Sequence, residues 1–167
     1  MLYLLLAAVI VAGDQAVKSW AVANLRGRGA VDFIPGFIHF YYAENTGAAF
    51  SMLRDMRWLF IGVSILASIV IIYIILAKKI KSFWGLLPLS MILGGAVGNL
   101  IDRIFVGHVV DMFEFSFVRF AIFNVADIFV TAGGVLFCLY YIVSETRSMK
   151  AKDDGDPRPA GTDVNEN

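Results

Sequence analysis

The sequence predicts an all-α membrane protein with four transmembrane helices and a small extracytoplasmic β-sheet at the outer membrane surface. The first observation behind this is composition. Of the 167 residues, 59% are hydrophobic, whereas a soluble domain is about 45–50% apolar. The second is that four segments are apolar over the length of a bilayer. The third is that two connections between these segments are rich in aromatic and β-branched residues, which favour strands.

Each predicted span supplies about 20 mainly apolar residues, the number that a helix needs to cross a bilayer. Residues 58–77 contain no charged side chain and are the clearest case. The first span must continue through Asp14 and Lys18, because its uninterrupted apolar part ends at Gly13. These two charges, with no basic residue before the apolar run, favour a retained helix over a cleaved signal peptide. The predicted spans are about 2–25, 58–77, 83–104 and 120–145.

The distribution of basic residues predicts how the spans are oriented. The loop between the second and third spans is KKIKS, at 78–82, and three more basic residues follow the fourth span. Short loops rich in Lys and Arg lie in the cytoplasm, although the first outer connection also contains arginines. Both termini are therefore expected in the cytoplasm. Residues 1–147 are predicted to form a single integral-membrane domain, and the polar, aperiodic residues 148–167 a disordered cytoplasmic tail.

The two outer connections carry strand signals. Residues 31–42, VDFIPGFIHFYY, combine β-branched and aromatic residues with a Pro-Gly turn signal at 35–36. Residues 113–120, FEFSFVRF, begin by alternating Phe with polar residues. Together they predict a small sheet whose aromatic side chains lie in the membrane interface.

Charged and amide side chains within the spans fall on single helix faces, because residues three or four apart are neighbours on a helix. An isolated charge at the bilayer centre costs at least about 2.5–3.5 kcal/mol, so we expect these groups to meet in one polar pocket near the outer leaflet. Asp111 follows the third span closely and is placed to face Asp127. The glycines Gly94, Gly95 and Gly98 would let helices approach each other here. The polar residues are Asp14 and Lys18 in the first span, Asn99, Asp102 and Arg103 in the third, and Asn124 and Asp127 in the fourth.

Structural roles remain open for several of these residues. Asp14 with Lys18, and Asp102 with Arg103, can equally be buried ion pairs that only hold helices together. Asn45 can simply form a turn with the glycine two residues later.

The residue types argue against metal-dependent and serine-dependent hydrolysis and leave acid–base catalysis by a pair of carboxyl groups. The chain has two histidines and no HExxH motif, and no GxSG motif for serine catalysis. The one cysteine, Cys138, excludes a disulfide framework and is expected to be a small buried apolar residue. The formal net charge of zero suggests no nucleic-acid partner. Two close carboxyls share one proton, so one can take a proton from water while the other gives one to a peptide carbonyl.

Five short motifs occur in order along the chain. They are DQxxK at 14–18, ENTGAAF at 44–50, GGAVGNLIDR at 94–103, GHVVDMF at 107–113 and FNVADIF at 123–129. With four spans, this set resembles the lipoprotein signal peptidases, the bacterial type II signal peptidases, from about residue 7 to 143. Each motif alone is weakly specific, whereas the ordered set is highly specific.

The resemblance implies an aspartyl endopeptidase of the bacterial inner membrane with its active site toward the outer leaflet. Such enzymes remove the signal peptide from prolipoproteins that carry a diacylglyceryl group, cleaving just before the lipidated cysteine. It implies membrane lipids and globomycin-type cyclic peptides as further partners, no cofactor and no metal, and we expect a monomer. The implied catalytic pair is Asp111 and Asp127. The implied substrate-binding residues are Asn45, Asn99, Arg103 and Asn124, with supporting roles for Asp14, Lys18, Asp102 and Gly95.

The main alternative is an ion or proton transporter, because charged residues inside membranes also mark ion pathways. Two features argue against it: the polar residues gather toward one side of the membrane, and residues 58–77 offer no charge to continue a path. A purely structural subunit would leave Asp111 and Asp127 unexplained.

Overall fold

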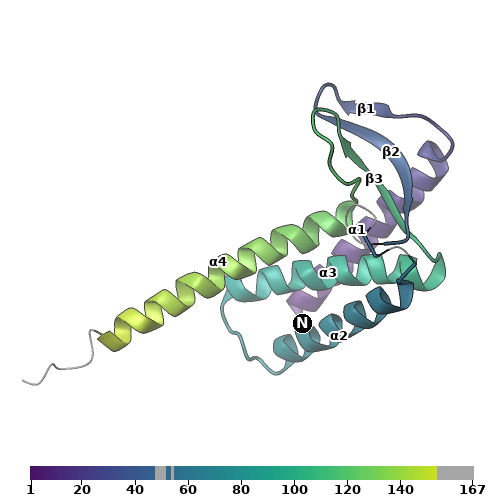
Figure 1. Cartoon of the computed structure of the whole chain (residues 1–167). Helices are drawn as coiled ribbons and strands as arrows, with labels where there is room; N and C mark the ends of the chain where they lie inside the picture. The colour runs from purple at the N-terminus through teal and green to yellow at the C-terminus, as the bar shows by residue number, and fades with distance from the viewer. Residues whose placement is uncertain (48–51, 54, 154–167) are drawn as a thin grey trace, which may run out of the picture.

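The computed structural model describes residues 1–47, 52–53 and 55–153, and it confirms the predicted fold class (Figure 1). The described part holds four helices long and apolar enough to cross a membrane, and a three-stranded antiparallel sheet. The elements, in chain order, are α1 Leu2–Leu25, β1 Val31–Ile34, β2 Ile38–Asn45, α2 Arg57–Leu76, α3 Phe83–Phe105, β3 Val109–Phe115 and α4 Val125–Asp153.

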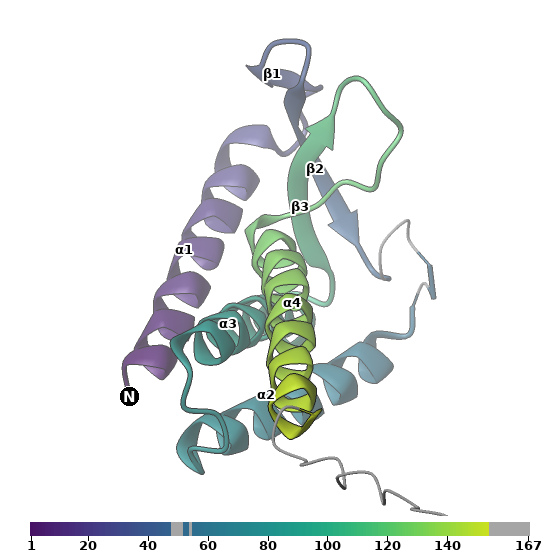
Figure 2. The same ribbon diagram turned by 90° about the vertical axis from the view of Figure 1, so that its left-hand side faces the viewer.

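Helix α3 is the centre of the helical part, since α1, α2 and α4 all pack against it (Figures 1 and 2). Glycines explain how closely the helices approach. A Cβ on Gly94 would lie 2.8 Å from the side chain of Ile10 in α1. A Cβ on Gly95 would collide with the backbone oxygen of Ala126 in α4. The predicted glycine stripe of α3 therefore allows two helices to approach closely, α1 at Gly94 and α4 at Gly95.

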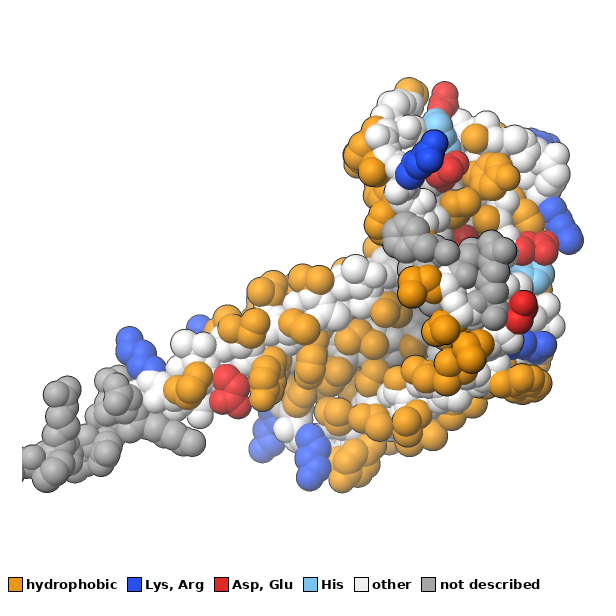
Figure 3. Space-filling view, in the orientation of Figure 1, with side chains coloured by type: hydrophobic (Ala, Val, Ile, Leu, Met, Phe, Trp, Pro, Cys, Tyr) orange, Lys and Arg blue, Asp and Glu red, His pale blue; other side chains and the backbone are white. Residues whose placement is uncertain are grey.

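The outer faces of the helices are apolar, as a lipid environment requires. Hydrophobic side chains cover most of the visible helical surface, and basic side chains gather at the end of α4 and at the α2–α3 loop (Figure 3). Cys138 lies on such an outer face of α4 and is exposed, so the expectation that it is buried was wrong.

The sheet has the strand order β1-β2-β3 and lies beyond one end of α2, α3 and α4, with the last turns of α1 packed against it (Figures 1 and 2). Gly36, with φ of +73°, forms part of the turn between β1 and β2, in agreement with the Pro-Gly signal. Phe40 lies at the centre of an aromatic cluster, with ring centroids 4.5 Å from Phe33, 5.1 Å from Trp20 and 5.7 Å from Phe113. This end of the molecule therefore has the aromatic surface expected at a membrane interface.

Two element boundaries differ from the sequence prediction in ways that matter for the site. Strand β3 begins at Val109, so Asp111 lies within a strand, paired with Ala43, and not in a loop. Helix α4 begins at Val125 instead of about 120. The reason is that Phe123 exchanges two backbone hydrogen bonds with Phe113, of 2.9 and 3.0 Å, which keeps the preceding segment extended.

The remaining differences are small. Helix α3 ends at Phe105, within one residue of the prediction. Helix α4 continues to Asp153, so residues 148–153 of the expected disordered tail are helical, and residues 154–167 lie outside the described part.

Candidate active site

The polar residues of α1, α3, β3 and α4 meet where the helices end beneath the sheet, as their positions on helix faces predicted. Their burial is nearly complete, with Asp14 and Asn124 0% exposed and Asp111 1% exposed. Every buried side-chain nitrogen or oxygen in the described part has a hydrogen-bond partner. The buried members are Asp14, Lys18, Asn99, Asp102, Asp111 and Asn124.

Lys18 joins α1 to α3 through three contacts. Its Nζ lies 2.9 Å from Oδ2 of Asp14 and 2.9 Å from Oδ2 of Asp102, and it donates to Oδ1 of Asn99 over 2.9 Å. An ammonium group has three protons to donate, so these three acceptors satisfy all the hydrogen-bonding capacity of Lys18. Asp102 pairs with Lys18 and not with its sequence neighbour Arg103, because adjacent residues on a helix do not face each other.

The two carboxylates beside Lys18 also fix backbone segments. Oδ1 of Asp14 accepts a hydrogen bond of 2.9 Å from the backbone N–H of Ala126, at the start of α4. Oδ2 of Asp102 accepts one of 3.1 Å from the N–H of Val110, in β3. The Lys18 cluster thus sets the positions of the two elements that carry Asp127 and Asp111.

Asn124 and Asp127 form a reciprocal cap at the start of α4. The backbone N–H of Asp127 donates to Oδ1 of Asn124 over 2.9 Å, and the N–H of Asn124 donates to Oδ2 of Asp127 over 3.2 Å. This is the capping-box arrangement, in which the residue just before the helix and the third residue of the helix satisfy each other's backbone. The local sequence NVAD therefore helps to orient the Asp127 carboxylate through contacts at the start of the helix itself.

Amide side chains bridge Asp111 and Asp127. Asn124 Nδ2 donates to Oδ1 of Asp111 over 2.6 Å, and Asn45 Nδ2 donates to its Oδ2 over 2.9 Å. Asn99 Nδ2 donates to Oδ1 of Asp127 over 2.8 Å. Burial, followed by the nearby charge of Asp127, raises the pKa of Asp111 to about 7, and the hydrogen bonds from Asn45 and Asn124 oppose this rise.

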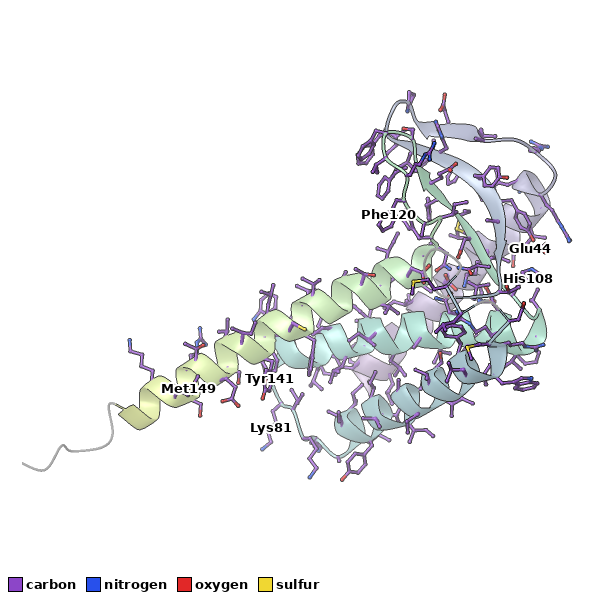
Figure 4. All side chains as sticks on the ribbon, in the orientation of Figure 1. Glu44, Lys81, His108, Phe120, Tyr141 and Met149 are labelled. Carbon is purple, nitrogen blue, oxygen red and sulfur yellow. The ribbon has the colours of Figure 1, made fainter. Side chains whose placement is uncertain are left out.

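A cavity of about 670 Å³ opens beside the two carboxyl groups, between the sheet, α3 and α4. Arg103 lies on one wall, where its Nη2 donates to the carbonyl of Gly47 over 3.2 Å and its guanidinium lies 4.9 Å from the centre of the Phe60 ring. Phe120 is on another wall, and Figure 4 shows it well apart from Glu44 and His108. The polar lining consists of Asn45, Asn99, Arg103, Asp111 and Asp127, with Thr131 further along α4.

The structure separates the residues expected to bind substrate into two groups. Asn45, Asn99 and Arg103 line the cavity, whereas Asn124 is fully buried outside the lining and hydrogen-bonds to both carboxyl groups. Gly95 also lies away from the cavity and allows the close α3–α4 contact.

Two contributors were not found from the sequence. Gln15 donates through Nε2 to Oδ1 of Asp102 over 3.0 Å and to the carbonyl of Gly98 over 3.1 Å. Its position next to Asp14 in the DQxxK motif could have indicated that Gln15 belongs to the same polar cluster. Phe60, beneath Arg103, belongs to a uniformly apolar span and gave no signal.

The described residues contain no group of three or more His, Cys, Asp or Glu side chains placed to hold a metal ion. The chemistry that the site does offer is proton transfer between two carboxyl groups and a molecule in the cavity.

Four spans and a polar cavity near one end define an integral membrane protein with a buried polar site, and solved membrane enzymes share this fold. Two solved structures of bacterial membrane enzymes superpose on the chain, with TM-scores of 0.77 and 0.75. The first is 25% identical and covers 95% of this chain and 94% of that one. The second is 28% identical and covers 83% and 91%.

The particular family follows from the sequence comparisons. The family model described as signal peptidase (SPase) II matches residues 6–143. The lipoprotein signal peptidase of Clostridioides difficile (strain 630) is 39% identical over 148 residues, or 89% of this chain and 99% of that protein. The enzyme of the same name from Enterococcus faecalis (strain ATCC 700802 / V583) is 38% identical over 92% of this chain and 95% of that protein. The chain belongs to the signal peptidase II family, which favours a peptidase over the ion-transporter alternative.

Proposed function

We propose that the chain is an aspartyl endopeptidase that removes the signal peptide from diacylglyceryl-modified prolipoproteins, cleaving just before the lipidated cysteine. The observation that carries the mechanism is the pair Asp111 and Asp127, bridged by Asn124, on the wall of a cavity of about 670 Å³. The substrate class rests on the relatives named lipoprotein signal peptidase.

The environments of the two carboxyls support different roles. Asp111, with its pKa raised to about 7 chiefly by burial, is partly protonated at neutral pH and acts as the general acid. Asp127 accepts hydrogen bonds from Asn99 Nδ2 and the Asn124 N–H at the start of a helix, where a negative charge is favoured, and acts as the general base.

The reaction needs one water and no covalent intermediate. Water attacks the scissile carbonyl carbon while its proton passes to Asp127, and the carbonyl oxygen takes the proton of Asp111. The carbon–nitrogen bond of the tetrahedral intermediate then breaks. The leaving nitrogen receives the proton from Asp127, and Asp111 regains its proton from the hydroxyl. Both carboxyls return to their starting state, as catalysis requires.

The cavity offers separate surfaces to the two parts of such a substrate. An extended peptide has backbone groups that lipid cannot satisfy, and Arg103, Asn45 and Asn99 present polar atoms to it. Acyl chains need no hydrogen bonds and would leave along the apolar wall that includes Phe120 and Ile128. A cyclic peptide of the globomycin type would compete for the same space.

The basic α2–α3 loop supports an orientation with both termini in the cytoplasm. The site at the other end of the helices then lies toward the outer leaflet of the bacterial inner membrane. A single chain contributes both carboxyls, so the proposal needs only a monomer.

One comparison tests the function. Purified protein in detergent is given the same prolipoprotein with and without its diacylglyceryl group, and product is measured by mass spectrometry. We expect the lipidated form to be cleaved and the unlipidated form to be cleaved much more slowly or not at all. Equal rates would contradict the lipoprotein assignment, and no cleavage of either form would contradict the peptidase proposal.

A further inference from the structure

A second cavity, of about 530 Å³, lies far from the carboxyl pair, between the start of α3 and the second half of the membrane part of α4. The residues that α4 contributes recur three or four positions apart, which places them on one helix face. They change in character along the helix: Leu136 and Leu139 are apolar, whereas Ser144 and Arg147 are polar. The other side of the groove is lined by Ser82, Trp84, Leu87 and Pro88, at the start of α3.

The length of this groove matches one leaflet of a bilayer. The rise from Leu136 to Arg147 is about 16 Å at 1.5 Å per residue, and half of the hydrocarbon core is about 15 Å thick. The apolar end therefore lies at the depth of acyl chains, and Trp84, Ser82 and Arg147 lie at the depth of lipid headgroups. Trp is the side chain most suited to that level.

The headgroup end of the groove is positively charged. Residues 78–82 and 144–150 contain five basic side chains, Lys78, Lys79, Lys81, Arg147 and Lys150, and one acidic side chain, Glu145. Figure 3 shows the basic groups around the end of α4 and the α2–α3 loop, and Figure 4 shows Lys81 near this part of α4. Arg147 forms no ion pair with any residue that the structure describes. The Ser82 hydroxyl makes no capping bond to α3, although it stands at the helix start, where anions are favoured.

We propose that this groove binds one anionic phospholipid from the leaflet beside the α2–α3 loop. An acyl chain would lie against Leu136 and Leu139, and the phosphate would contact Arg147 and Ser82. A soluble anion would leave the apolar half of the groove empty, and a zwitterionic lipid would gain less from the basic cluster. The site does not depend on the peptide-cleavage mechanism.

The test is native mass spectrometry of the full chain in detergent, titrated with phosphatidylglycerol or phosphatidylcholine of identical acyl chains. One basic side chain near a membrane surface favours anionic lipid about five-fold. We therefore expect wild type to retain phosphatidylglycerol preferentially, and Arg147→Gln to lower that preference about five-fold. Arg119→Gln removes the same charge from an exposed position outside the groove, and it should retain the wild-type preference.

A second pair of variants locates the lipid in the groove. Leu139→Trp should reduce retention of both lipids by filling the apolar half, whereas Leu66→Trp, on an exposed face of α2, should not. Equal retention of the two lipids by wild type, or identical behaviour of Arg147→Gln and Arg119→Gln, would overturn the proposal. A lipid-free dimer in the same spectra would also overturn it, because a second copy would then cover the groove.

Discussion

Lys18 donates a 2.9 Å hydrogen bond to Oδ1 of Asn99, and this contact decides which way the Asn99 amide points. With its oxygen held by the ammonium group, Asn99 must present Nδ2 to the cavity, where it donates to Asp127 over 2.8 Å. Lys18 therefore positions the carboxylate of Asp127 without touching it.

Replacement of Lys18 should be severe. Lys18→Met leaves Asp14 and Asp102 buried without their cation, a change that costs about 3–5 kcal/mol. We expect a large fall in the thermal midpoint measured in detergent, together with loss of cleavage. Lys81→Met, which removes an exposed lysine of the α2–α3 loop, is the control and should melt like wild type. A stable, active Lys18→Met protein would show that the cluster does not organise the site.

The carboxyl pair should be essential for turnover. Asp111→Asn and Asp127→Asn should each lower cleavage by about 10²–10⁴-fold, the usual contribution of a general acid or base. Both proteins should still insert and purify as folded chains. Glu114→Gln changes a partly exposed carboxylate of the same strand as Asp111 and should cleave normally. If either Asp variant cleaves at nearly the wild-type rate, the role proposed for that residue fails.

The raised pKa of Asp111 predicts how stability depends on pH. Its value is about 7 in the folded protein and 3.8 without the fold. Between these values the folded state holds a proton that the unfolded state has released, so stability falls as pH rises through this window and levels off above it. Thermal midpoints from pH 4.5 to 8.5 test this.

Asp111→Asn cannot titrate and should show a smaller decrease over the same pH range. Cleavage by wild type should also decline as pH rises past about 7, because the general acid loses its proton. A midpoint that falls equally in wild type and Asp111→Asn would assign the pH dependence to another group.

Gly98 and Gly134 both lie within helices, but only Gly98 is packed closely against another helix, so replacing each of them tests the helix packing. A Cβ on Gly98 would lie 2.7 Å from Oδ2 of Asp14, whereas a Cβ on Gly134 would meet nothing within 4 Å. Gly98→Leu should therefore lower both the thermal midpoint and activity. Gly134→Ala should be neutral or stabilising by up to about 1 kcal/mol, the usual gain in a helix interior. Unchanged melting of Gly98→Leu would show that this face of α3 is open to lipid.

Much of the fold could be predicted because hydropathy and helix periodicity act locally. Charged and amide side chains three or four residues apart in the first, third and fourth spans pointed to one common pocket, and the structure brings them together. The start of α4 was misplaced because Phe120–Phe123 are as apolar as a span, and only their pairing with Phe113 shows that they are extended. The ion pairs also depend on the tertiary structure. Asp102 pairs with Lys18 on another helix, although the sequence alone suggested its neighbour Arg103 as the partner.

The length of α4 has a consequence for whatever follows it. Its 29 residues span about 44 Å, and the hydrocarbon core of a bilayer is about 30 Å thick. About 14 Å of this helix therefore stands as a stalk in the headgroups and the water beyond them. Electrostatic forces at physiological ionic strength fade over about 8 Å. The headgroups occupy about 5–7 Å of that distance, so the chain beyond Asp153 departs about one screening length from the charged lipid surface.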